Sequence, residues 1–119
     1  MTSVFENISG AELEAMDDDQ LDSVEFGVIG LDASGMVCRY NARESALAGL
    51  RRESVLDCDY FNEIAQCMNN FLVAQRFEDE SEIDDVIPYV LTLRMRPTPV
   101  RLRLLKSSEM TLRYILIQR

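Results

Sequence analysis

The sequence predicts an α+β fold: a five-stranded antiparallel sheet flanked by short helices and one longer helix, with an N-terminal helical cap. Two observations lead to this prediction. Strand-like apolar segments bounded by turn residues occur twice in the first part of the chain and three times at its end. The stretches between them carry helix caps and apolar residues at helical spacing. Consecutive hairpins give an antiparallel sheet with helices packed on its faces.

Residues 1–24 are expected to form the cap. Ser9 and Glu12 have the spacing of a capping box, which begins a helix. Two short helices, separated at Asp17–Asp19, fit the pattern. The apolar residues of the segment form a sparse stripe: Ile8, Leu13, Met16 and Leu21. Because it has few apolar contacts to make, the cap is expected to be among the least stable parts of the fold.

The core is expected to span residues 25–119, which makes the chain 1–119 a single domain. Gly35 supplies the positive φ of a hairpin turn, and Asn41 and Gly49 are typical residues for the two ends of a short helix. Pro97 and Pro99 are expected to break the sheet between two strands. The predicted elements are strands 26–32 and 36–40, helices 42–47, 51–56 and 71–77, and strands 88–96, 100–104 and 110–118.

The composition of the chain argues against several classes of function. The net charge of −9 disfavours nucleic acid and anionic membranes as partners. The chain has no histidine, which removes Ser-His and Cys-His nucleophile pairs, the usual zinc sites and histidine-ligated haem, so neither an enzyme nor a metal site is expected. Arginines of the last strands are expected to pair with the excess acid rather than bind phosphate: Arg94, Arg96, Arg101 and Arg103.

The three cysteines form no C-x-x-C pair, and their odd number argues against a closed disulfide set. No segment resembles a membrane span or a signal peptide. We therefore expect a reducing, cytoplasmic location. Cys38 and Cys58 are expected to be structural or incidental.

Cys67 lies just ahead of the predicted 71–77 helix. Asn69 and Asn70 are typical N-cap residues for that helix. A thiol near a helix N-terminus feels the positive end of the helix dipole, which favours the thiolate. Cys67 is thus placed to react, or to carry a group through its sulfur. The alternative is that Cys67 is a small buried hydrophobe, as most free cysteines are.

The order of elements is similar to a PAS domain, and a set of residues along the chain makes a closer match: Met16-Asp17-Asp18, Gln20-Leu21-Asp22, Phe26-Gly27, Leu31-Asp32, Tyr40-Asn41-Ala42 with Glu44, the Cys67 segment, and Met95 with Pro97-Thr98. With these residues the chain resembles the photoactive yellow protein family. The resemblance runs from about Leu13 to the end of the chain. It keeps the spacings from Tyr40 to Glu44 and from Glu44 to Cys67.

The resemblance implies a blue-light photoreceptor with a covalent p-coumaric acid (4-hydroxycinnamic acid) chromophore. The chromophore would be a thioester on Cys67, whose backbone N–H would support the thioester carbonyl. Tyr40 and Glu44 would donate hydrogen bonds to its buried phenolate oxygen. The pocket wall would be formed by Leu50, Tyr60, Ile64 and Met95.

Glu44 can donate only when protonated, and burial beside an anion raises the pKa of a carboxyl. The family's trans–cis photoisomerisation would let Glu44 pass its proton to the phenolate. Glu44 would then be a buried carboxylate, and Leu50 offers no cation to pair with it. An unpaired buried charge costs several kcal/mol. Release of the cap, and with it the signalling state, is the expected response.

Three positions depart from the family's best-known member, which has a threonine in place of Ala48, an arginine lid in place of Leu50 and a proline in place of Gln66. These departures keep a second function open: a PAS-type module for protein interaction or small-ligand sensing, without the covalent chromophore. A cysteine-dependent acyl-transfer enzyme is disfavoured because no histidine base exists. The downstream partner is unknown, and a monomer or weak dimer is expected.

Overall fold

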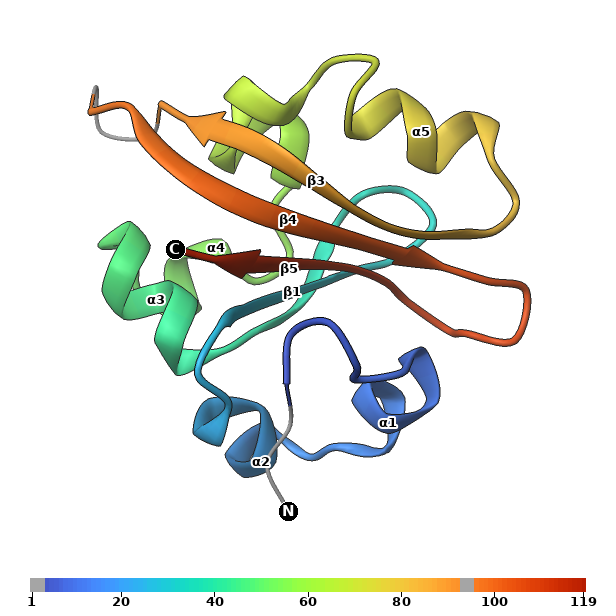
Figure 1. The fold of residues 1–119 in the computed structure, drawn as a ribbon. Helices are drawn as coiled ribbons and strands as arrows, with labels where there is room; N and C mark the ends of the chain where they lie inside the picture. Colours follow the sequence, from blue (N-terminus) through green and yellow to red (C-terminus); the bar gives the residue numbers. More distant parts are fainter. Residues whose placement is uncertain (1–3, 93–95) are drawn as a thin grey trace.

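The computed structural model describes residues 4–92 and 96–119 and shows one sheet with helices on both faces (Figure 1). The sheet has five strands in the order β2-β1-β5-β4-β3, and every neighbouring pair is antiparallel. This confirms the predicted fold class. The strands are β1 (Gly27–Leu31), β2 (Val37–Tyr40), β3 (Ile83–Leu91), β4 (Thr98–Lys106) and β5 (Arg113–Gln118).

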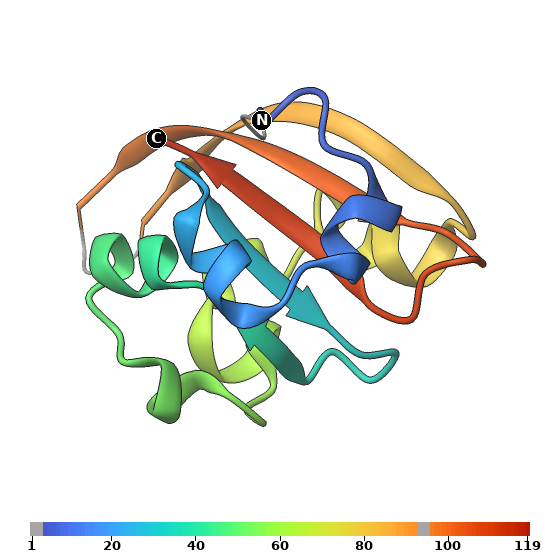
Figure 2. The ribbon, with the colours of Figure 1, turned by 90° about the horizontal axis from the view of Figure 1, so that it is seen from below.

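The helices divide between the two faces of the sheet. Helices α1 and α2 cover one face, α5 lies on the opposite side, and α3 lies beside β1 (Figures 1 and 2). The helical elements are α1 (Gly10–Ala15), α2 (Asp18–Ser23), α3 (Ala42–Ala48), α4 (Arg52–Val55), the π-helical turn η1 (Tyr60–Ile64), the 3-10 turn η2 (Gln66–Met68) and α5 (Ala74–Asp79). No helix within the described residues is both long enough and apolar enough to span a membrane.

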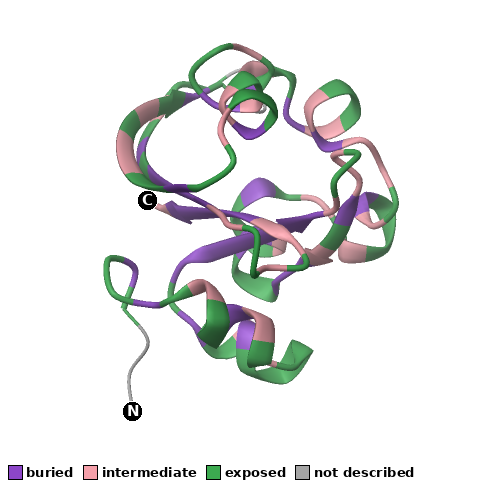
Figure 3. Ribbon diagram, turned by 90° about the vertical axis from the view of Figure 1, so that its right-hand side faces the viewer, coloured by how far each residue is buried: buried purple, intermediate pink, exposed green. Residues whose placement is uncertain are grey.

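Two apolar cores form because β-strand side chains alternate between the faces of the sheet. Figure 3 shows the buried strands between the cap and the remaining helices. In β5, Ile115 and Ile117 face the larger core, whereas Tyr114 and Leu116 face the cap. The larger core contains Tyr40 and Tyr60, and Leu50, Ile64 and Cys67 pack against it.

The cap has more apolar contacts than its sparse pattern indicated. Phe5, Ile8, Leu13 and Leu21 are each at most 2% exposed, and they pack on the outer face of the sheet. The expectation of a cap with few apolar contacts is therefore wrong, because nearly every apolar residue in it is used. The two predicted helices are confirmed, and each begins with a capping box.

Arginines from the sheet also hold the cap. Arg39 donates to the carbonyls of Leu13, at 2.8 Å, and Met16, and Arg103 donates to those of Phe5, at 2.9 Å, and Ile8, at 2.5 Å. Acidic partners were predicted for the last-strand arginines. The prediction is confirmed for two of them: Arg101 pairs with Glu6 at 2.7 Å, and Arg103 with Asp84 at 3.0 Å.

Several boundaries differ from the predictions. Strand β3 begins at Ile83 rather than Pro88, because Arg103 and Arg76 pair with the aspartates that follow Ile83. Strand β4 begins at Thr98 and includes Pro99, a tolerated place near a strand start. Helix α5 is six residues long and shorter than expected, and it starts at Ala74.

Candidate functional site

Asn41 fixes the start of α3, and with it the position of Glu44. The buried Asn41 side chain accepts through Oδ1 from the backbone N–H of Glu44 at 3.1 Å and of Val28 at 3.0 Å. Its Nδ2 donates to the carbonyls of Leu21 at 2.9 Å and Phe26 at 3.0 Å. The predicted N-cap is confirmed. One amide side chain therefore joins α3 to β1 and to α2 of the cap.

The Glu44 carboxylate occupies space that Gly27 leaves free. Glu44 is 1% exposed. A Cβ at residue 27 would lie 2.1 Å from Glu44 Oε1, which is closer than two such atoms can approach. Gly27 pairs with Ile117 across β1 and β5. The carboxylate is thus directed to the end of β5, which Arg119 follows.

Arg119 forms a two-pronged ion pair with Glu44. Its Nη1 lies 2.8 Å from Oε1 and its Nη2 lies 3.2 Å from Oε2. Burial raises the pKa of Glu44, while the hydrogen bonds and charge of Arg119 act in the opposite direction. The sequence analysis expected a carboxylate without a cation because Leu50 is apolar. That expectation is wrong, because Arg119 supplies the cation from a distant part of the chain.

Tyr40 and Tyr60 lie in the core against which Cys67 packs, and both are within electrostatic range of Glu44. Tyr40 is 3% exposed and Tyr60 is 1% exposed. Burial raises the pKa of Tyr40, and the Glu44 charge adds to the rise. Burial also raises the pKa of Tyr60 well above its usual value, and the charges of Glu44, Tyr40 and Cys67 raise it further. Tyr60 is therefore within electrostatic range of all three residues that the resemblance singled out.

The two tyrosine hydroxyls are available as donors. Among residues 4–92 and 96–119, no side-chain oxygen is both fully buried and without a hydrogen-bond partner, so neither hydroxyl is an orphaned polar group. A ligand that brings an oxygen acceptor to this core would accept from both hydroxyls.

Cys67 lies in η2 with a free, half-buried thiol that packs against the larger core. The segment is held from β3: the Tyr89 hydroxyl donates to the Cys67 carbonyl at 2.6 Å. Asn70 Nδ2 donates to the same carbonyl at 3.2 Å and to the Tyr89 hydroxyl at 2.7 Å. These bonds fix the backbone at Cys67 and in the residues that follow it.

The predicted relation between Cys67 and a helix N-terminus is wrong. Helix α5 begins at Ala74, and a turn separates it from η2. Neither Asn69 nor Asn70 caps α5, because its N-cap is Val73 and no side chain bonds there. The Asn70 Oδ1 instead accepts from the N–H groups of Leu72 at 3.0 Å and Val73 at 3.2 Å, in that turn. The dipole of α5 therefore does not act on the thiol in the way that the sequence suggested.

The expected wall residues lie partly where they were predicted. Leu50 and Ile64 are half-buried against the same core as Tyr60 and Cys67. The loop carrying Leu50 is tied back by Ser45, whose Oγ donates to the Leu50 carbonyl at 2.5 Å. Met95 lies outside the described residues.

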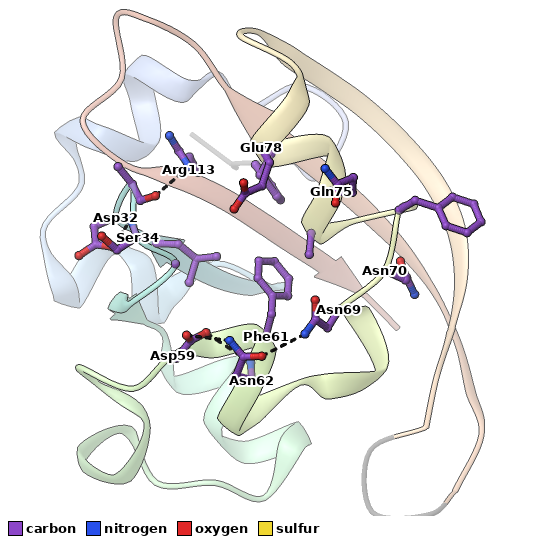
Figure 4. Close-up of a pocket in the computed structure, with 16 residues that line it drawn as sticks. Asp32, Ser34, Asp59, Phe61, Asn62, Asn69, Asn70, Gln75, Glu78 and Arg113 are labelled. Carbon is purple, nitrogen blue, oxygen red and sulfur yellow. Dashed lines mark hydrogen bonds between the residues drawn. The ribbon is translucent and has the colours of Figure 1, made fainter.

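A polar cleft of about 380 Å³ lies beside this site, between the Asp32–Gly35 turn and α5 (Figure 4). Asn62 crosses its floor with hydrogen bonds to Asp59 at 2.9 Å and Asn69 at 3.1 Å. Cys67, Tyr40 and Glu44 do not line it. Phe61 does, and its ring lies 5.4 Å from that of Tyr60, so an aromatic layer separates the cleft from the buried site.

Comparison with known proteins shows which family the chain belongs to. No family model matches it. It is 33% identical over 98 residues to the photoactive yellow protein of Halochromatium salexigens, covering 80% of this chain and 78% of that protein. The chain belongs to the photoactive yellow protein family. A second member, from Rhodothalassium salexigens, is 29% identical over 107 residues, covering 87% of this chain and 86% of that protein.

Solved structures agree with this membership. The photoactive yellow protein domain of the sensor histidine kinase Ppr from Rhodospirillum centenum matches with a TM-score of 0.84 at 27% identity, covering 93% of this chain and all of that one. A PAS domain of an HTR-like protein from Haloarcula marismortui matches in fold, with a TM-score of 0.65 at 21% identity and coverage of 92% and 94%. The predicted PAS-like fold is confirmed. The part of Ppr that matches is its photoactive yellow protein domain, which is a sensory domain.

Proposed function

We propose that this protein is a blue-light photoreceptor that carries p-coumaric acid as a thioester on Cys67. Membership of the photoactive yellow protein family supports the sensory role. The observation that carries the chemistry is the gathering of a free thiol, Tyr40, Glu44 and Tyr60 at one buried core. When bound, the chromophore supplies a double bond that light isomerises and a phenol that absorbs visible light when ionised.

Cys67 forms the thioester by acyl transfer. Its sulfur attacks the carbonyl carbon of an activated p-coumaric acid, the S–C bond forms, the activating group leaves and the thiol proton is released. No oxidant is needed. The Tyr89 and Asn70 side chains hold the Cys67 carbonyl, so they fix the direction of the attached group. The backbone N–H of Cys67 would support the thioester carbonyl.

Tyr40 and Glu44 are the proposed donors to the phenolate oxygen. A phenolate in an apolar core needs strong hydrogen bonds, and bonds from O–H donors to an anion are among the strongest in proteins. The Tyr40 hydroxyl has no described partner, so it is available. Glu44 becomes a donor when it takes up a proton, which the burial of its carboxyl favours. Tyr60 adds a third hydroxyl near the same atoms.

The proposed signal leaves the site through Asn41. A change of charge at Glu44 shifts the start of α3, where Asn41 joins the Glu44 N–H to the Leu21 carbonyl of α2. Asp22 makes the second link from α2 to α3, because its carboxylate accepts from the Ala42 N–H at 2.8 Å. We propose that α2 is the part of the cap that is released first.

Reconstitution tests the proposal. Purified protein is mixed with an activated ester of p-coumaric acid, and the absorption spectrum and intact mass are recorded. We expect a visible band and one added p-coumaroyl group, both lost in Cys67→Ala. Cys58→Ala is the matched control, since Cys58 is also half-buried, and it should load normally. Absence of a band and of any mass gain on Cys67 would instead favour a PAS module without a covalent chromophore.

A further inference from the structure

The Glu44–Arg119 pair has a direct chemical consequence for the proposed chromophore. An ionised carboxylate only accepts hydrogen bonds, whereas a donor to a phenolate must carry the proton. Arg119 binds both Glu44 oxygens, with N–O distances of 2.8 and 3.2 Å. This two-pronged geometry is the one that stabilises a carboxylate best. Arg119 and a phenolate therefore favour opposite protonation states of Glu44.

The groups around Glu44 determine how this conflict is resolved. Tyr40 of β2 and Tyr60 of η1 face it as neutral phenols, because burial raises the pKa of both. Cys67 of η2 acts on Tyr60 and would be neutral as a thioester. Arg119, after β5, is the cation that acts on Glu44. A single cation in a buried site stabilises one negative charge far better than two. The Glu44 carboxylate and the chromophore phenolate therefore compete to be the one anion.

We propose that Arg119 is a positioning residue that holds Glu44 as a carboxylate and so shifts the shared proton of the pocket onto the phenol oxygen of the chromophore. The step is a proton transfer from Glu44 Oε to the phenol oxygen, with no change in net charge and no redox partner. The dark protein then contains a neutral-phenol, ultraviolet-absorbing population beside the yellow phenolate form. This inference rests on the proposed function, but its first half concerns the protein without chromophore.

The first half is tested on the apoprotein. The Glu44 carboxyl is titrated by carbon-13 NMR and assigned from the signal that Glu44→Gln removes. Arg119→Gln should raise the titration midpoint by about one to three pH units, the range expected for a neighbouring opposite charge. Arg119→Lys keeps the positive charge but not the two-pronged hydrogen bonding of the guanidinium. It should therefore raise the Glu44 midpoint by less. An unchanged or lowered midpoint in Arg119→Gln overturns the proposal. If that variant does not fold, no rise in Arg119→Lys overturns it.

Arg113→Gln is the matched control. It removes the same charge from β5, the strand that Arg119 follows, but the Arg113 guanidinium donates to the Ala33 carbonyl at 3.3 Å, at the polar cleft. The Glu44 midpoint should be unchanged in this variant. An equal rise of the Glu44 midpoint in Arg113→Gln would show that the midpoint depends on the net charge of the protein. The ion pair with Arg119 would then not be what holds Glu44 as a carboxylate.

The second half is tested on protein loaded with p-coumaric acid. Spectra are compared at alkaline pH, where the visible band no longer grows with pH. At that pH Glu44 and the chromophore phenol share a single proton. Wild type should keep an ultraviolet phenol band there, and Arg119→Gln should reduce the phenol-to-phenolate ratio about tenfold or more, which corresponds to about one pH unit of altered affinity. A wild type with no phenol band, or an unchanged ratio in the variant, contradicts the proposal. Failure to load overturns the proposed function, while the apoprotein titration still decides the role of Arg119.

Discussion

The Glu44 carboxylate lies against the backbone of Gly27, in a space that no other residue at that position would leave. Since an added Cβ would lie 2.1 Å from Oε1, Gly27→Ala must displace the carboxylate and break its pair with Arg119. Loss of one partner from a buried ion pair costs about 3–5 kcal/mol. We expect Gly27→Ala to lower the free energy of unfolding by about 3 kcal/mol in denaturant titrations.

Gly10→Ala is the control for this variant, because its added Cβ meets only the flexible Met110 side chain. It should cost much less than Gly27→Ala. A double-mutant cycle with Glu44→Ala isolates the contact, since the penalty at residue 27 should largely disappear once the carboxylate is gone. Equal costs in both backgrounds would show that Gly27 acts through its backbone and not by making room for Glu44.

Asn41→Ala should loosen the cap as well as α3. The variant leaves the N–H groups of Glu44 and Val28 without their acceptor and the carbonyls of Leu21 and Phe26 without their donor. Loss of a cap costs about 1 kcal/mol, and each unpaired buried group adds about 1–3 kcal/mol. We expect a loss of about 3 kcal/mol, with faster amide exchange across residues 18–23.

Asn62→Ala is the matched control for Asn41→Ala. Asn62 also makes several hydrogen bonds, but they are exposed to water, which can replace them. This variant should change the stability little and leave exchange in the cap unaltered. Similar losses in the two variants would argue against Asn41 as the link between α3 and α2.

Glu44 should make stability fall as pH rises. Because its pKa is raised in the folded state, its contribution is fully present below the unfolded pKa, about 4.3, and is lost as pH rises through the folded pKa. Glu44→Gln cannot ionise, so wild type should lose stability relative to this variant above about pH 4.3. Thermal or chemical unfolding of both proteins across the acid and neutral range measures this difference.

Glu6→Gln provides a control of opposite sign. Glu6 is exposed, and its hydrogen bond with Arg101 lowers its pKa in the folded state. Wild type should therefore gain a little stability relative to Glu6→Gln as pH rises through the same range. If Glu44→Gln gave the same sign as Glu6→Gln, the Arg119 pair would outweigh the effect of burial.

Arg39→Met should release the cap from the sheet without touching the buried site. Its guanidinium donates to the Leu13 carbonyl at 2.8 Å and to the Tyr114 hydroxyl at 3.1 Å. We expect faster amide exchange in α1 and an unchanged Glu44 titration. Arg51→Met, at an exposed position with a 3.8 Å pair to Glu53, should alter neither, since such surface pairs contribute about 0–1 kcal/mol. Equal exchange in the two variants would remove Arg39 as an anchor of the cap.

Local sequence signals predicted the elements that local chemistry controls. The capping box at Ser9, the Asn41 cap and the Gly49 helix end were predicted and are all present. Each of these features depends on residues within one helical turn, so the local sequence is enough to predict it. The five antiparallel strands were likewise visible as short apolar segments between turns.

The parts that sequence analysis missed depend on residues far apart in the chain. Arg119 pairs with Glu44 across 75 positions, and no pattern around either residue indicates the contact. The start of β3 was missed because aspartates are unusual in a strand, and the local pattern does not show that Arg76 and Arg103 neutralise two of them there. A carboxylate pattern alone does not show where its cations will come from.

The central claim is that Cys67 carries the chromophore, and the intact mass of protein from its native host tests it most directly. The mass is measured before and after thioester cleavage by hydroxylamine, and peptide mapping locates any group. We predict an excess of one p-coumaroyl group on Cys67, removed by cleavage. An unmodified Cys67, or a group found on Cys38 or Cys58 instead, would contradict it.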